Sequence, residues 1–168
     1  LSVNIVISEN MITNSKDGIY TIQSNSTKIL GNTITEMSVN GINMGYSNSS
    51  QISGNFIQDC QKDGISLNQN FPCRDNVFTD NQLTRCGFYV TRYSQNISID
   101  TSNKVNGKSA RYFESKTGIS LVNEQDIGQL ILLGVNQSEF RGLSVSNVKG
   151  GTGVLISDSH NNTFTEIT

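Results

Sequence analysis

The fold is decided by the stretch "VNGINMGYSNSSQISGNFI", which runs from Val39 to Ile57. It contains a glycine followed by alternating apolar residues, then a polar turn rich in Asn and Ser, and then a second apolar alternation. The glycine motif recurs as "GIYTI" at Gly18, "GINMG" at Gly41, "GISLN" at Gly64, "GFYVT" at Gly87 and "GVLIS" at Gly153. The first four of these glycines are equally spaced, and the interval from Gly87 to Gly153 equals three slightly shorter steps. The chain therefore contains internal repeats of one short unit.

A second column of residues follows nearly the same period. The asparagines in "ISENMI", "ILGNTI", "ISGNFI" and "FTDNQL" are Asn10, Asn32, Asn55 and Asn81, and their spacing is close to that of the glycines. A unit this short, made of alternating strands and turns, cannot bury a core alone and must stack on its neighbours. The repeat predicts an all-β fold, a right-handed parallel β-helix of about seven coils with 22–23 residues per coil, over a single domain spanning residues 1–168.

In such a solenoid, each repeated position has one expected role. The asparagines are expected to form a ladder, each amide hydrogen-bonding the next coil and tolerating a left-handed backbone. The glycines mark a turn that needs positive φ or a close approach of two backbones. One set of β-branched side chains is expected to line the interior: Ile7, Ile12, Ile19, Ile29, Ile34, Ile42, Ile52, Ile57 and Ile65.

Composition excludes several classes of partner. The net charge is -2 and only 15% of residues are charged, with no cluster of Lys or Arg, so we expect no nucleic-acid partner and no membrane contact by this segment. The longest apolar run, Leu130 to Leu133, is far shorter than the roughly 20 residues of a membrane span. Because the chain begins at Leu1 and stops at Thr168 within a strand pattern, we expect a segment of a longer polypeptide.

The repeats resemble those of the NosD-type, carbohydrate-binding and sugar-hydrolase β-helices (the PbH1 repeat), common in periplasmic and archaeal cell-surface proteins. The stretches that carry the resemblance are "NKVNGKSARYF", from Asn103 to Phe113, and "IGQLILLGVNQSEFRGLSVSNVKGGTGVLISDSHNNTFTEI", from Ile127 to Ile167. The resemblance covers nearly the whole chain and implies the fold. It says little about activity, since this architecture carries many functions.

The three cysteines follow the repeat in part. Cys60 and Cys86 each lie at the same distance after a ladder asparagine, so they are expected at the same corner of adjacent coils, within disulfide range or as two buried thiols. Cys73 lies in "NQNFPCRDN", the longest interruption of the early repeats, and could pair between molecules or be a free thiol. With one histidine, His160, and no closely spaced cysteines, we expect no metal site and no cofactor.

A pair of carboxylates is the weak candidate for catalysis. "KDGI" occurs twice and places Asp17 and Asp63 two coils apart on one face, with Asn40 between them. Two coil rises separate them by about 10 Å, near the spacing of an inverting glycosidase pair. Asp-Gly and Asn-Gly are also ordinary turn sequences, which explains all three positions.

The best candidate for binding is a group of aromatic and basic residues around "GFYVTRY". Alternate side chains of this strand project from one sheet, and they suit sugar binding or the base and neutralising groups of a polysaccharide lyase. The candidates are Arg74, Arg85, Tyr89, Arg92 and Tyr93.

Five N-x-S/T sequons fall in or beside turns: Asn25, Asn48, Asn96, Asn136 and Asn161. Exposed turns are where a glycan is allowed, so these candidates for N-glycosylation favour an extracellular, cell-surface protein.

Between Lys104 and Gln129 the repeat is interrupted by an irregular insertion, in which we expect Tyr112 and Phe113 to continue a coil strand and the loop from Lys116 to Asp126 to contact a partner. Open coil ends expose strand edges, so we expect neighbouring domains or other copies to cover them as a homo-oligomer. The leading interpretation is a non-catalytic cell-surface module that assembles a layer, sheath or filament and binds polysaccharide. The alternatives are a polysaccharide lyase or glycoside hydrolase, and a NosD-like periplasmic maturation factor.

Overall fold

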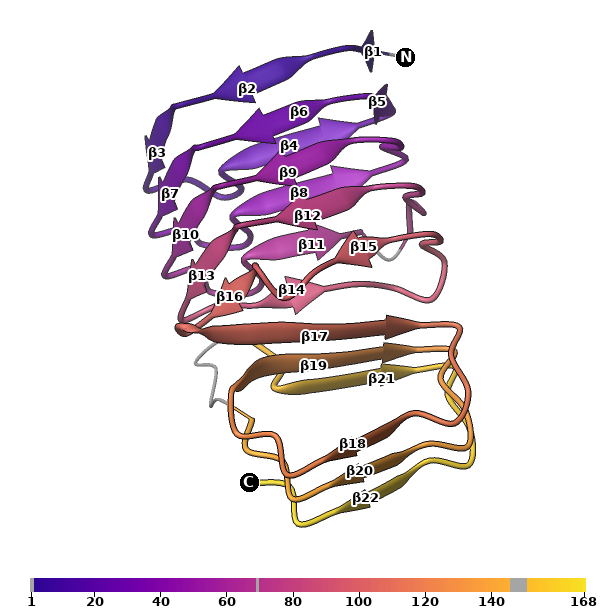
Figure 1. The fold of residues 1–168 in the computed structure, drawn as a ribbon. Helices are drawn as coiled ribbons and strands as arrows, with labels where there is room; N and C mark the ends of the chain where they lie inside the picture. The colour runs from indigo at the N-terminus through magenta and orange to yellow at the C-terminus, as the bar shows by residue number, and fades with distance from the viewer. Residues whose placement is uncertain (1, 69, 146–150) are drawn as a thin grey trace.

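The computed structural model describes residues 2–68, 70–145 and 151–168, and the regular structure of these residues consists of strands. The chain winds through about seven coils that form two stacks; the first ends at Val105 and the second begins at Lys108 (Figure 1). The predicted parallel β-helix is therefore confirmed. No helix among the described residues has the length and apolar character needed to cross a membrane.

The first stack has three parallel sheets, and each of its first four coils contributes one strand to each sheet. The first sheet contains β2 (Val6–Ser8), β6 (Lys28–Leu30), β9 (Gln51–Ser53), β12 (Val77–Thr79) and β15 (Ser98–Ile99). The second contains β3 (Met11–Thr13), β7 (Thr33–Thr35), β10 (Phe56–Gln58), β13 (Gln82–Thr84) and β16 (Lys104–Val105). The third contains β4 (Ile19–Ile22), β8 (Ile42–Gly45), β11 (Ile65–Leu67) and β14 (Phe88–Tyr89). The short strands β1 (Ser2–Val3) and β5 (Ser24–Asn25) pair at one corner.

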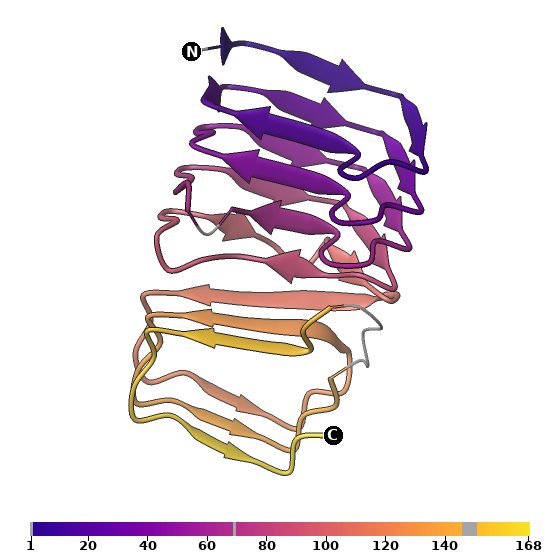
Figure 2. The same cartoon turned by 180° about the vertical axis from the view of Figure 1, so that it is seen from behind.

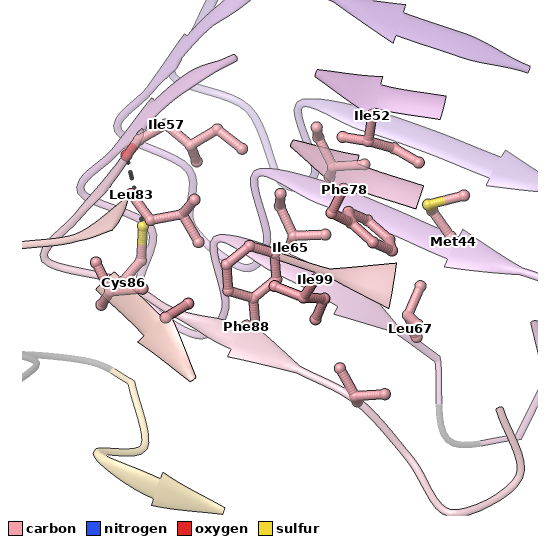
Figure 3. Packing of buried hydrophobic residues seen from close by; sticks show 14 of the residues in the cluster. Met44, Ile52, Ile57, Ile65, Leu67, Phe78, Leu83, Cys86, Phe88 and Ile99 are labelled. Carbon is pink, nitrogen blue, oxygen red and sulfur yellow. Dashed lines mark hydrogen bonds between the residues drawn. The ribbon is translucent and has the colours of Figure 1, made fainter. Parts of the chain in front are cut away.

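The core lies inside the coils, where equivalent residues stack in register. Ile12 and Ile57 both pair with Ile34, and Ile57 pairs in turn with Leu83. Of the nine isoleucines expected in the interior, seven are buried, while Ile7 and Ile12 of the first coil are partly buried. Figure 3 shows two positions where phenylalanine takes the place of isoleucine: Phe78 pairs with Ile52 and Ile99, and Phe88 pairs with Ile65. The rings of Phe78 and Phe88 meet edge to face at 6.0 Å between centroids. Stacking one branched or aromatic side chain on another fills the interior without gaps.

The ladder asparagines hydrogen-bond from coil to coil. The side-chain Oδ1 of Asn55 accepts from the backbone N and the Nδ2 of Asn32, at 3.0 Å each, and Asn55 donates in the same way to Asn81. The amide also donates to Ile29 O, a backbone carbonyl of the coil before. A fifth member, Asn103, continues the ladder after Asn81. The ladder amides are thus paired with one another and with the backbone, which is what a polar corner inside a solenoid requires.

One detail of the corners differs from expectation. The ladder asparagines do not have the left-handed conformation; the residue before each of the first four does, such as Glu9, Gly54 and Asp80. Of the two roles expected for the repeated glycines, close approach is the one observed, because a Cβ on Gly41 would lie 2.5 Å from the carbonyl oxygen of Gly64 in the next coil.

Residues 104–129, expected to be an irregular insertion, are instead largely strand. After β16 the chain turns back through Asn106 and Gly107 into β17 (Lys108–Glu114), an antiparallel pairing between parallel coils. The second stack then runs through β18 (Ser120–Val122), β19 (Ile127–Leu133), β20 (Glu139–Arg141), β21 (Val154–Ser157) and β22 (Thr163–Thr165). It has two sheets: β17, β19 and β21 continue the sheet that contains β16, and β18, β20 and β22 form a second sheet (Figure 2). The interruption is a change of cross-section.

In the sheet of β17, β19 and β21, strand β19 is buried on both faces. In β19, Ile131 and Leu133 join the core of the first stack, whereas Leu130 and Leu132 join the core of the second. A strand covered on both sides carries apolar residues on both sides, which explains the run "LILL". This sheet therefore closes the end of the first stack.

At the change of cross-section, some backbone groups of the first stack have no strand of a next coil to pair with. Two polar side chains form hydrogen bonds with these groups instead. The Gln129 amide, fully buried, accepts from Phe88 N at 2.8 Å and donates to Phe88 O at 2.8 Å and Thr152 O at 2.7 Å. The Glu114 carboxylate accepts from Asn96 N at 3.0 Å and Ile97 N at 2.9 Å. Each side chain replaces the neighbouring strand that the repeat would otherwise supply.

Replacing Gln129 with leucine is expected to lower the free energy of unfolding by about 2 kcal/mol, because the Phe88 N–H and two carbonyls lose their partner inside the core. Urea unfolding followed by circular dichroism measures the change. Gln51→Leu, on the exposed face of β9, is the matched control and should change stability little. Equal effects of the two substitutions would contradict this role for Gln129.

Candidate functional site

A pocket of about 370 Å³ lies at the seam between the two stacks. One wall is the segment from Tyr89 to Tyr93, at and after the end of β14, and the other is Leu155, Ile156 and Ser157 of β21. These walls are far apart in sequence, and only the closing sheet brings them together. Three of the five predicted binding residues line the pocket: Tyr89, Arg92 and Tyr93.

Arg92 is positioned by the residue that follows it. Its Nη2 donates to Tyr93 Oη at 2.6 Å, and its Cζ lies 4.7 Å from the centroid of the Tyr93 ring. Asp158, next to β21, lies at 3.6 Å from Arg92 Nη1. Lys62 does not line the pocket, but its Nζ lies 5.9 Å from the centroid of the Tyr89 ring. Two positively charged side chains, Arg92 and Lys62, thus lie near the aromatic rings of the pocket.

The remaining lining is apolar with scattered hydroxyls. Tyr93 and Ile156 are about half exposed, at 49% and 48%, and offer apolar surface to a ligand. Thr91 Oγ1 is buried and has no hydrogen-bond partner among the described residues. A concave site with aromatic surface and a few polar groups is the usual form of a small-ligand site.

The other two predicted binding residues lie elsewhere, so the five do not form one cluster. Arg85 forms an ion pair with Asp59 through Nε and Nη2, at the corner that follows β13. Arg74 is exposed at a corner before β12, where its backbone N donates to Asn48 Oδ1 at 2.8 Å.

The two candidate catalytic carboxylates take part in contacts within the stacked coils. Asp17 accepts from Asn40 Nδ2 at 2.8 Å, and Asn40 lies between it and Asp63 as predicted. Asp63 is only 8% exposed, and burial raises the pKa of its carboxyl to about 6 although Lys62 and Ser66 act in the opposite direction. A carboxyl with so little exposure has poor access to a polysaccharide.

The candidate disulfide does not form: Cys60 and Cys86 are free and buried. They occupy adjacent coils, as expected, and the hydrogen bond with the Cys60 thiol, together with burial, raises the pKa of Cys86. Their side chains act as small apolar groups beneath the glycine turns, where a Cβ on Gly64 would lie 2.8 Å from Cys86 Sγ.

Cys73, in the interruption of the early repeats, is a free thiol, which was one of the two predicted alternatives. Its side chain is fully buried and packs in the core of the first stack, with Sγ 3.5 Å from Met44 O. Burial raises the pKa of this thiol. A free thiol in that position has no access to a second molecule.

The sequon asparagines take part in the coil corners. Asn25 Oδ1 accepts from Asn48 N at 3.1 Å, and Asn136 Oδ1 accepts from His160 N at 2.9 Å. The hydroxyl two positions later also has a structural role, since Ser50 Oγ accepts from Thr27 N at 3.1 Å. The corner thus explains why N-x-S/T recurs, and glycosylation stays a prediction. Asn96 and Asn161 are the two sequon asparagines that are exposed.

Sequence reasoning missed Thr91, Ile156 and Asp158 at the pocket and Gln129 beneath β14. The signal available was weak: Gln129 interrupts an apolar run, and "GVLIS" at Gly153 follows the same repeat as "GFYVT" at Gly87. Within the described ranges, no group of three His, Cys, Asp or Glu side chains could hold a metal ion.

Comparison with solved structures finds a similar fold in the Streptococcus pneumoniae surface protein and adhesin PfbA, at 15% sequence identity and a TM-score of 0.46. The alignment covers 99% of this chain and 48% of that one, so this chain spans about half of that structure. No curated protein is similar enough in sequence to be a relative. The family described as the right-handed β-helix region matches residues 2–105, which end at β16, the last strand of the first stack. With well over half of its residues matched, this chain belongs to the right-handed β-helix family.

Proposed function

We propose that this β-helix is a non-catalytic glycan-binding module of a cell-surface protein, and that the pocket at the seam is its binding site. The observation that carries the proposal is the combination of two tyrosine rings, a positioned guanidinium and an apolar wall in one exposed hollow. Sugar rings present an apolar face of C–H groups and a rim of hydroxyls, and such a pocket offers partners for both. The coils serve as a rigid scaffold that holds these side chains in place.

Replacing Tyr93 with alanine is expected to weaken glycan binding at least tenfold, since it removes a stacking surface and the group that positions Arg92. Binding to an oligosaccharide panel, measured by calorimetry on the purified chain, tests this. Tyr46→Ala is the matched control: Tyr46 is 40% exposed but packs on Phe71 away from the pocket, at 5.0 Å between ring centroids. A panel that contains no ligand for the unsubstituted protein would refute the proposal.

A polysaccharide lyase is the second candidate, because the Tyr93 hydroxyl lies 2.6 Å from a guanidinium nitrogen, and a lyase needs a base beside a group that neutralises a carboxylate. β-Elimination leaves a carbon–carbon double bond next to the carboxylate, which absorbs ultraviolet light. A rise in absorbance when the protein is mixed with a uronic-acid polymer, lost in Tyr93→Phe, would favour the lyase over the binding module.

The proposal includes a location outside the cell, because that is where a glycan-binding surface meets its ligand. Assembly through the coil ends into a layer or filament, and a NosD-like role, stay predictions.

A further inference from the structure

We propose that the seam pocket selects acidic glycans, with Arg92 binding a carboxylate of the ligand and Asp158 being the group that this carboxylate displaces. The inference rests on the proposed function and adds the chemical class of the ligand. It also assigns Asp158 a part in specificity.

The ion pairs of the described arginines differ in how tightly they are made. Arg111 places both Nε and Nη2 on Glu124, with Nε at 2.9 Å, and Arg85 contacts both carboxylate oxygens of Asp59. The Arg92–Asp158 pair is looser: at 3.6 Å it is longer than a hydrogen bond, and each side chain is 52% exposed. Such a pair contributes little to stability and is easily exchanged for another carboxylate.

Arg92 does not depend on Asp158 for its position. The hydrogen bond to Tyr93 Oη and the contact with the Tyr93 ring hold the guanidinium, which keeps further N–H donors for a ligand. A planar guanidinium held in one orientation binds a carboxylate through two parallel hydrogen bonds. Because the orientation already exists in the free protein, less side-chain entropy is lost on binding.

The charge of the lining also favours an anion. Arg92 is the charged residue among those that line the pocket, and Lys62 adds a second positive charge beside Tyr89. A neutral sugar would partly desolvate the guanidinium without giving it a carboxylate, which is unfavourable. An acidic sugar supplies that carboxylate while its ring lies against Tyr93 and Ile156.

The test uses two ligands that differ only at the carboxyl group: a uronic-acid oligosaccharide, which is charged, and its methyl ester, which is neutral. The unsubstituted protein is expected to bind the acid at least tenfold more tightly than the ester. Arg92→Gln should remove this preference, and Arg92→Lys should retain part of it, because a lysine keeps the charge but loses the two-pronged geometry. Asp158→Asn should tighten binding of the acid severalfold and leave binding of the ester unchanged, since it removes the competing carboxylate.

The outcomes separate this inference from the function on which it rests. If neither ligand binds and no other glycan does, the proposed function fails. If acid and ester bind equally, or if Asp158→Asn weakens binding of the acid, the glycan-binding function stands and the assignment of Arg92 and Asp158 is overturned. Because both side chains are half exposed, the variants should fold normally, which a circular dichroism spectrum checks.

Discussion

Replacing Asn55 with alanine is expected to lower the free energy of unfolding by about 4 kcal/mol, because several buried polar groups lose their partners at once. Asn55 is 1% exposed and lies in the middle of the ladder. Its amide accepts from Asn32 and donates to Ile29 O and Asn81 Oδ1. Alanine would leave these groups unpaired in the interior, and each one costs about 1–3 kcal/mol.

The measurement is urea unfolding, with Asn10→Ala as a control from the same ladder. Asn10 makes the same two bonds to Asn32 Oδ1, but it is exposed, so water can replace what alanine removes. We expect Asn10→Ala to cost about 1 kcal/mol. Similar losses for the two variants would show that burial does not determine the strength of the ladder.

The second large effect concerns Asp63 and depends on pH. Asp17, Asn40 and Asp63 occupy equivalent positions in three consecutive coils, since Gly18 N donates to Asn40 O and Gly41 N donates to Asp63 O. The Asn40 amide gives its Nδ2 to Asp17, while Asn40 Oδ1 and Asp63 Oδ2 are buried acceptors without a hydrogen-bond partner among the described residues. Both unpaired atoms are acceptors, so a proton on Asp63 would supply the donor that this column lacks.

The direction of the pH dependence follows from the raised pKa. Burial moves the pKa of Asp63 from 3.8 to about 6, so the folded protein holds this proton more tightly than the unfolded chain does. The stabilisation is fully present below pH 3.8 and is lost as the pH rises through about 6. This difference in pKa corresponds to about 3 kcal/mol.

Asp63→Asn is therefore expected to be more stable than the unsubstituted protein by up to about 3 kcal/mol above the raised pKa, because an amide can donate at every pH. At acidic pH the two proteins should be similar. Urea unfolding across this pH range measures the difference, and Asp80→Asn on the exposed surface controls for the loss of one negative charge. Parallel stability curves for Asp63→Asn and the unsubstituted protein would refute a proton on Asp63.

The candidate site was only partly predictable. The repeat placed Tyr89, Arg92 and Tyr93 on one segment, and all three line the pocket. Arg74 and Arg85 were grouped with them because they are near in sequence, but corners of a solenoid point in different directions. The opposite wall, from Leu155 to Asp158, lay outside any grouping based on the sequence, because it meets Arg92 only through the sheet that closes the first stack.

The coils, their register and the asparagine ladder can be derived from the repeat in the amino-acid sequence. A period of about 22–23 residues places like residues above one another, and interactions between identical positions follow from that period alone. Three features could be found only in the folded protein: where the repeat changes cross-section, which strand is buried on both faces and which side chains close the exposed edges. These features depend on contacts between non-equivalent residues, such as the bonds between Phe88 and Gln129, which are 41 residues apart. A periodic pattern carries no information about such contacts, because they exist only where the period is broken.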